Sequence, residues 1–187
     1  MRASLCGLLV LFGGCVTVDA TLRSEGSGTF EMTYQTPLDA TEFLERRRFS
    51  SPHVHVESVK IHEDQRAVLR ATVDDVTRLS TAPGFAAVTI DRAPAGDDDW
   101  LTVTLANPAP PHSVPDEGPW LTLRLALPGR VREANRHAEI TGGRVTWVLS
   151  RGAFLDARET VFRVRYRRAS NTGVPLASGE PLSRRRP

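Results

Sequence analysis

Cys15 is the residue of this chain whose surroundings most clearly indicate a chemical role. It follows the pair Gly13-Gly14 and an apolar run, and Arg2 is the single cation before that run. A short cationic start, an apolar stretch and small residues before a cysteine are typical of a secretory leader that ends at a lipidation site. The glycines let a peptidase approach the backbone closely, and the thiol can accept a diacylglyceryl group before cleavage. The sequence therefore predicts a signal peptide over residues 1–14 and a lipid on Cys15.

An alternative interpretation of Cys15 is a plain core residue at the end of a buried apolar N-terminus. A free cysteine packs well as a small hydrophobe. The joint placement of Arg2, the apolar run, two glycines and Cys15 at the start of the chain favours the lipidation site. Acylation would also remove Cys15 from any role as a nucleophile.

Three histidines and a glutamate are the next candidates for chemistry, as ligands of a zinc ion. His53, His55 and Glu57 alternate along one face of a predicted strand, and His62 follows. Imidazole nitrogens at this spacing can bind zinc, but a pair from one strand needs further ligands from elsewhere. Valines occupy the intervening positions, which turns the histidines away from the apolar side. We therefore expect no metal site.

Other enzyme signatures are missing from the sequence. There is no Gly-x-Ser-x-Gly elbow of a serine hydrolase and no glycine loop that could cradle a phosphate. The run Asp97-Asp98-Asp99 lacks the spacing and the final glutamate of an EF-hand loop, and we interpret it as a solvated hairpin tip. The sequence predicts a non-enzymatic protein without a cofactor.

Composition and charge indicate one globular domain. The chain has 187 residues, a formal net charge of +2 and 40% apolar residues, which suffice for one core after removal of the leader. Cys6 lies inside the predicted leader, so no disulfide is expected. No run after Cys15 reaches the roughly 18 apolar residues that span a bilayer, and attachment to a membrane would depend on the lipid. The nearly balanced charge gives no reason to expect a nucleic-acid partner.

Residues 169–187 are predicted to form a disordered, basic C-terminal tail. From Arg163 onward the chain has seven arginines and a single acid, Glu180. Such a tail can contact anionic lipid headgroups, where each cation near the surface contributes about 1 kcal/mol. The favoured alternative is a solubilising end, because Lys60 is the only lysine and the arginines therefore reflect a general bias of the chain.

Most of the chain between these ends alternates apolar and polar residues, the period of strands with one buried face. The strands predicted in this way cover residues 16–22, 30–34, 54–61, 67–73, 85–92, 100–106, 121–127, 131–140, 144–149 and 162–166. Short helices are predicted over 37–48 and 74–80, where acids come early and a stop follows. Short turns between neighbouring strands predict antiparallel pairing. The expected fold is a single α+β domain over residues 15–168, with a curved, antiparallel, multi-stranded sheet and two short helices.

Two short helices cover too little area to bury one face of such a sheet. The remaining apolar surface can enclose a pocket, or the sheet can fold on itself around a dry core. If the surface encloses a pocket, alternating apolar residues of the predicted strands 121–127 and 144–149 would line it and bind a hydrophobic ligand. These residues are Leu121, Leu123, Val145 and Trp147.

Several segments in a fixed order resemble the LppM family of bacterial lipoproteins. Leu127-Pro128-Gly129 leads to Asn135 and then to the strand Val145-Thr146-Trp147. Further matches are the opening Cys15-Val16-Thr17-Val18-Asp19, the turn Gly26-Ser27-Gly28 and the segment Asp74-Asp75-Val76-Thr77-Arg78-Leu79. The similarity covers roughly residues 15–167. Many members have a glycine after the asparagine, where this chain has Arg136, and a transmembrane helix near the C-terminus, where this chain has residues 175–187 without one.

The resemblance implies an envelope-anchored α+β domain that holds hydrophobic or lipid-like ligands and has no catalytic residues. Together with the residues, it predicts a cell-envelope lipoprotein attached to the membrane through lipidated Cys15. The other reading is a scaffold with a solid core that engages a second envelope protein. Val16 follows Cys15, instead of the aspartate associated with inner-membrane retention, so in a host with two membranes the periplasmic face of the outer membrane is expected.

Overall fold

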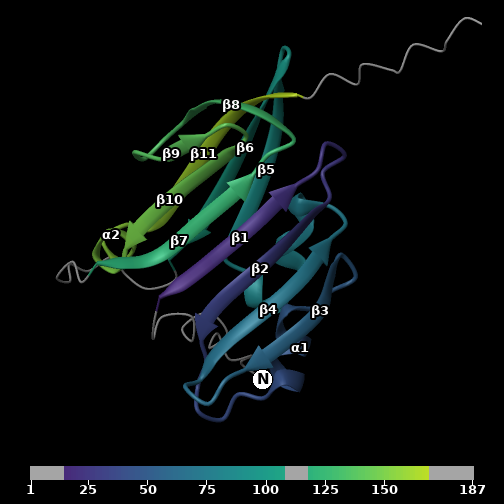
Figure 1. The fold of residues 1–187 in the computed structure, drawn as a ribbon, viewed down its shortest axis with the longest axis vertical. Coiled ribbons are helices and arrows are strands. Elements are labelled where there is room, and N and C mark those ends of the chain that lie inside the picture. The colour runs from purple at the N-terminus through teal and green to yellow at the C-terminus, as the bar shows by residue number, and fades with distance from the viewer. Residues whose placement is uncertain (1–14, 108–117, 169–187) are drawn as a thin grey trace, which may run out of the picture.

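The computed structural model describes residues 15–107 and 118–168, and these form two β-sheets with four short helices (Figure 1). The predicted leader and the predicted basic tail lie outside the described residues. In chain order, the elements are β1 (Val16–Leu22), β2 (Gly28–Gln35), α1 (Glu42–Phe49), β3 (Val54–Ile61), β4 (Arg66–Val73), η2 (Val76–Thr81), η3 (Pro83–Phe85), β5 (Val88–Ala95), β6 (Asp98–Ala106), β7 (Pro119–Ala126), β8 (Gly129–Ala134), β9 (Glu139–Thr141), β10 (Arg144–Ser150), α2 (Arg151–Leu155) and β11 (Glu159–Arg168).

The large sheet has seven strands in the order β3-β4-β2-β1-β7-β10-β9. Strands β1 and β7 pair in parallel, with Val18 opposite Leu123, while the other pairs are antiparallel. The prediction of a purely antiparallel sheet was therefore wrong. A parallel pair needs a long crossover, and here the chain builds the hairpin of β5 and β6 before it returns beside β1. Alternation of apolar residues does not encode strand direction, so the sequence did not reveal this pairing.

The small sheet has four antiparallel strands in the order β5-β6-β11-β8. It forms a second layer, and in Figure 1 its strands cross behind β7 and β10. The expectation of one curved sheet is corrected to two facing sheets. The expected α+β class is supported in part, because the domain is rich in strands and its helices are all short.

The helices are shorter than predicted or of another type. Helix α1 begins after Thr41, whose side chain accepts a hydrogen bond from the Leu44 amide at 3.3 Å, since the preceding residues turn at Pro37. The second predicted helix is the 3-10 helix η2, capped by Asp75. Helix α2 was not predicted, because its five residues are too few to show a helical period.

The run Asp97-Asp98-Asp99 is not a solvated tip. Asp97 lies in the turn, but Asp98 and Asp99 begin β6 and are buried. Arg165 Nε lies 2.8 Å from Asp98 Oδ2, and Arg168 Nε lies 3.3 Å from Asp99 Oδ1. Burial of these carboxylates is compensated by arginines of β11, a partnership between distant segments that a local reading of the run could not show.

Candidate functional site: an apolar cavity between the sheets

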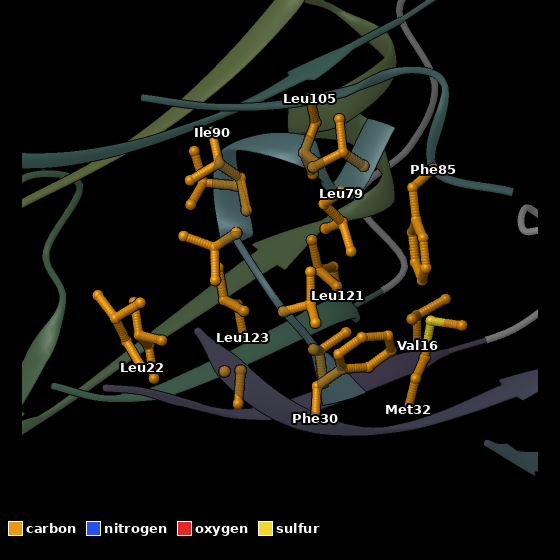
Figure 2. Close-up of a pocket in the computed structure, with 18 of the residues that line it drawn as sticks. Val16, Leu22, Phe30, Met32, Leu79, Phe85, Ile90, Leu105, Leu121 and Leu123 are labelled. Atoms are coloured by element: carbon orange, nitrogen blue, oxygen red, sulfur yellow. The ribbon is translucent and has the colours of Figure 1, made fainter. Parts of the chain in front are cut away.

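A cavity of about 190 Å³ lies between the inner faces of the two sheets (Figure 2). In the close-up, Phe30 and Met32 enter from the large sheet, while Ile90 and Leu105 enter from the small sheet. The strands contribute alternate residues, because every second side chain of a strand points to the same face. From β1 these are Val16, Val18, Ala20 and Leu22; from β6 they are Leu101, Val103 and Leu105.

The lining is apolar almost throughout. Among the described residues that line it, Thr21 and Thr29 have polar side chains and none is charged. A lining with so few hydrogen-bond donors and acceptors suits a ligand, or a segment of one, that has no hydrogen-bonding groups of its own.

Several lining side chains in the middle of strands are only partly buried. Val18 of β1, Phe30 of β2, Val103 of β6 and Leu123 of β7 all fall in this class. In a closely packed sandwich these central positions would be fully covered. Their exposed atoms lack partners across the cavity, so an apolar guest would add dispersion contacts that the empty protein does not make.

The cavity volume limits the size of the guest. An apolar cavity of about 150 Å³ stays dry and accepts a molecule such as benzene, whereas pockets for drug-sized ligands span roughly 300–1,000 Å³. The cavity of about 190 Å³ falls between these cases. A cavity of this size fits one segment of a hydrocarbon chain.

One wall of the cavity is built by the two 3-10 helices. Val76 and Leu79 of η2 and Phe85 of η3 line it. The Phe85 ring packs edge-on against Phe30 with centroids 5.4 Å apart, and it lies 4.9 Å from the ring of Phe49. This aromatic row joins helix α1 to the cavity wall.

Asp75 fixes the start of that wall. Its carboxylate accepts hydrogen bonds from the Thr77 amide at 2.9 Å and from the Thr77 hydroxyl at 2.8 Å. Partial burial opposes ionisation of Asp75, but the two hydrogen bonds outweigh it and hold the pKa of this carboxyl below its usual range. The cap is therefore charged near neutral pH.

The four residues predicted to bind a ligand are divided by the structure. Leu121 and Leu123 line the cavity. Val145 and Trp147 pair with the neighbouring strand on the same face, but they do not line it. The Trp147 ring instead packs 5.5 Å from Phe162, and its Nε1 donates to the carbonyl of Asn135 at 2.9 Å. These two residues lie in the solid part of the core, one strand beyond the cavity.

Most of the lining was not singled out from the sequence. The residues from β1 and β6 carried a strand signal, but only the opposition of two sheets makes them cavity walls. Trp120 of β7 and Phe154 of α2 also line the cavity and stack with ring centroids 4.7 Å apart. Trp120 is buried within the core.

The other candidates for chemistry lie outside the cavity. His55 is exposed, and its Nε2 lies 3.0 Å from Asp74 Oδ2. Across residues 15–107 and 118–168, no three His, Cys, Asp or Glu side chains are grouped so that they could hold a metal ion.

Cys15 is a free, exposed thiol directly before β1, 3.1 Å from the carbonyl oxygen of Pro119. In the same part of the chain, no helix is long and apolar enough to cross a bilayer.

These features define an α+β domain of two facing sheets around an apolar cavity. The same fold is found in the NMR structure of the folded domain of the Mycobacterium tuberculosis LppM protein, with a TM-score of 0.53 at 16% sequence identity. The match covers 91% of this chain and 96% of that domain. No protein-family model and no curated protein sequence matches the chain. The likeness confirms an LppM-like fold.

Proposed function

We propose that this protein is a non-enzymatic, lipid-anchored lipoprotein of the cell envelope that binds the hydrocarbon chain of a lipid or another hydrophobic ligand. The observation that carries the proposal is the apolar cavity between the sheets. An apolar guest gains free energy when it enters such a lining.

The anchor is inferred from the leader pattern and from the position of Cys15. Residues 2–14 have the order of a lipoprotein leader, and Cys15 is exposed directly before β1. Several acyl chains on one cysteine bind a bilayer far more firmly than a single chain does. In a host with two membranes, the residue after Cys15 favours the periplasmic face of the outer membrane.

The scaffold alternative requires a closely packed interior and a protein partner. The partly exposed side chains that line the cavity argue against the scaffold alternative, because a closely packed core would cover them. The shared fold supports the lipoprotein reading, because the structural neighbour is the folded domain of an LppM protein.

The proposal is tested with the full chain, expressed in a bacterial host and purified from the envelope. Native mass spectrometry and organic extraction would identify any lipid retained by the folded protein. A Val103→Phe variant places a larger side chain inside the cavity, while Val148→Phe enlarges a side chain that is 59% exposed and serves as the matched control.

We expect stoichiometric lipid on the wild type and on Val148→Phe, and at least a tenfold loss of lipid on Val103→Phe. Equal lipid on all three proteins would mean binding outside the cavity. A lipid-free wild type that stays so after incubation with envelope lipids would contradict the proposal and favour the scaffold.

A further inference from the structure

A cluster of large apolar side chains is exposed at the start of helix α1. Five such side chains are exposed in the part of the chain that the structure describes, and three of them fall within residues 38–44. Leu38 is 89% exposed, Phe43 71% and Leu44 51%. Isolated exposed apolar residues need no explanation, but a group of them marks an interaction surface.

The strand register places this cluster at the same end of the large sheet as Cys15. Strand β1 begins directly after Cys15 and runs antiparallel to β2, whose last residue, Gln35, precedes Leu38 by three positions. The amide of Ile61, the last residue of β3, donates to Glu42 Oε1 at 3.4 Å. Because β3 also ends at this side of the sheet, the first turn of α1 is fixed there too.

No spacer separates Cys15 from the sheet. A bilayer that holds a lipid on this cysteine would therefore lie within about one residue length of the sheet end, or roughly 3.5 Å. Strand β3, beside α1, lies three strand spacings from β1, about 14 Å. The exposed apolar side chains thus sit beside the anchor, at the end of the domain that must face the bilayer.

Charges at this end do not select an anionic surface. The exposed cations Arg46, Arg47, Lys60 and Arg66 are offset by the exposed acids Asp39, Glu42, Glu63 and Asp64. Contact with a bilayer would therefore come from the apolar side chains, and we expect it with neutral lipids as well.

We propose that Leu38, Phe43 and Leu44 insert into the bilayer that carries the Cys15 lipid and hold the domain upright on it. This inference rests on the proposed lipid anchor. It adds a second contact, which fixes the orientation of the domain relative to the membrane.

The test uses the full chain, processed by a bacterial host and reconstituted into phosphatidylcholine nanodiscs. Phe43→Cys, Leu44→Cys and Ile140→Cys are each labelled with a nitroxide. Ile140 is the matched control, because it is apolar and exposed but lies on β9, beside the start of β10, at the opposite end of the sheet. Relaxation by oxygen, which concentrates in the bilayer, is compared with relaxation by a water-soluble nickel chelate.

We expect oxygen to dominate at positions 43 and 44 and nickel to dominate at position 140. Nickel dominance at all three positions would overturn the inference while leaving the anchor intact. With Cys6 cleaved off and Cys15 acylated, the wild type has no thiol to label. Uptake of nitroxide at Cys15 of the wild type, located by peptide mass spectrometry, would show that this thiol is free, which would contradict the proposed anchor and, with it, this inference.

Discussion

Tyr34 joins helix α1 to the large sheet through one buried hydrogen bond. Its hydroxyl donates to Glu45 Oε2 at 2.7 Å, and Arg48 lies 3.6 Å from the same oxygen. Both Tyr34 and Glu45 are buried. A carboxylate in such a place depends on its partners, since burial without them costs free energy.

Replacement of Tyr34 by Phe removes the donor and leaves the buried Glu45 with Arg48 as its remaining partner in this group. We expect the free energy of unfolding to fall by about 1–3 kcal/mol, measured by urea denaturation. A double-mutant cycle with Glu45→Gln is the control, because the effect of Tyr34→Phe should be smaller once the carboxylate is absent. An effect of Tyr34→Phe that is the same in both backgrounds would show that Glu45 does not depend on Tyr34.

The same residues predict the behaviour at high pH. Burial raises the pKa of Tyr34 well above its usual range, and Glu45 adds to the rise. Burial likewise raises the pKa of Tyr166. These are the two tyrosines of the chain.

A tyrosine that keeps its proton in the folded state stabilises the fold fully below its unfolded pKa, near 10, and this contribution is lost as the pH rises above it. We expect the free energy of unfolding to fall steeply above pH about 10, with tyrosinate absorbance appearing together with unfolding. Tyrosinate absorbance from the folded protein near that pH would contradict this prediction.

At the scale of elements, Gly84 lets η3 approach helix α1. A Cβ at this position would lie 2.4 Å from two atoms of the Phe49 ring, and that ring is completely buried. Because the ring has no open space to move into, Gly84→Ala should cost about 1–3 kcal/mol through overpacking. A double variant with Phe49→Leu tests the cause, since it should recover part of the loss in a double-mutant cycle. Purely additive effects would point to a different origin.

Asp75 caps the 3-10 helix η2, which contributes Val76 and Leu79 to the cavity wall. Removal of the Asp75 carboxylate by Asp75→Ala should lower the free energy of unfolding by about 1 kcal/mol. The pKa of the Asp75 carboxyl is lower in the folded protein than in the unfolded chain. Asp75 therefore stabilises the fold fully above its unfolded pKa, near 4, and this stabilisation is lost as the pH falls through the folded pKa. We therefore expect the difference in free energy of unfolding between wild type and Asp75→Ala to disappear in acid. A difference that persists in acid would mean that the charge of Asp75 does not account for the stabilisation.

Elements were easier to predict from the sequence than their assembly. Alternation located β1, β4, β7 and β10, because each has one buried face. The same alternation would appear in one curved sheet or in two, and in a parallel or an antiparallel pair. The contrast between Leu123 and Trp147 shows the consequence: both point to the same side of neighbouring strands, yet one lines the cavity and the other packs against Phe162.

At the scale of the whole molecule, the domain has two apolar features of different purpose. The cavity lies between the sheets and is proposed to hold a hydrocarbon chain. The exposed cluster near Leu38 and Phe43 lies outside, at the end that carries Cys15, and is proposed to contact the bilayer. The two sets of residues do not overlap, so each proposal can fail without the other.

Binding of a hydrocarbon chain inside the cavity is the central proposal, and isotope-filtered NMR tests it without an intermediate step. A fatty acid with a ¹³C-labelled chain is added to the unlabelled full chain, and nuclear Overhauser contacts from the ligand to protein methyl groups are recorded. We expect contacts to Val18, Val103 and Leu123, which line the cavity from both sheets. Contacts confined to exposed methyls such as those of Val148, or no contacts at all, would contradict binding inside the cavity.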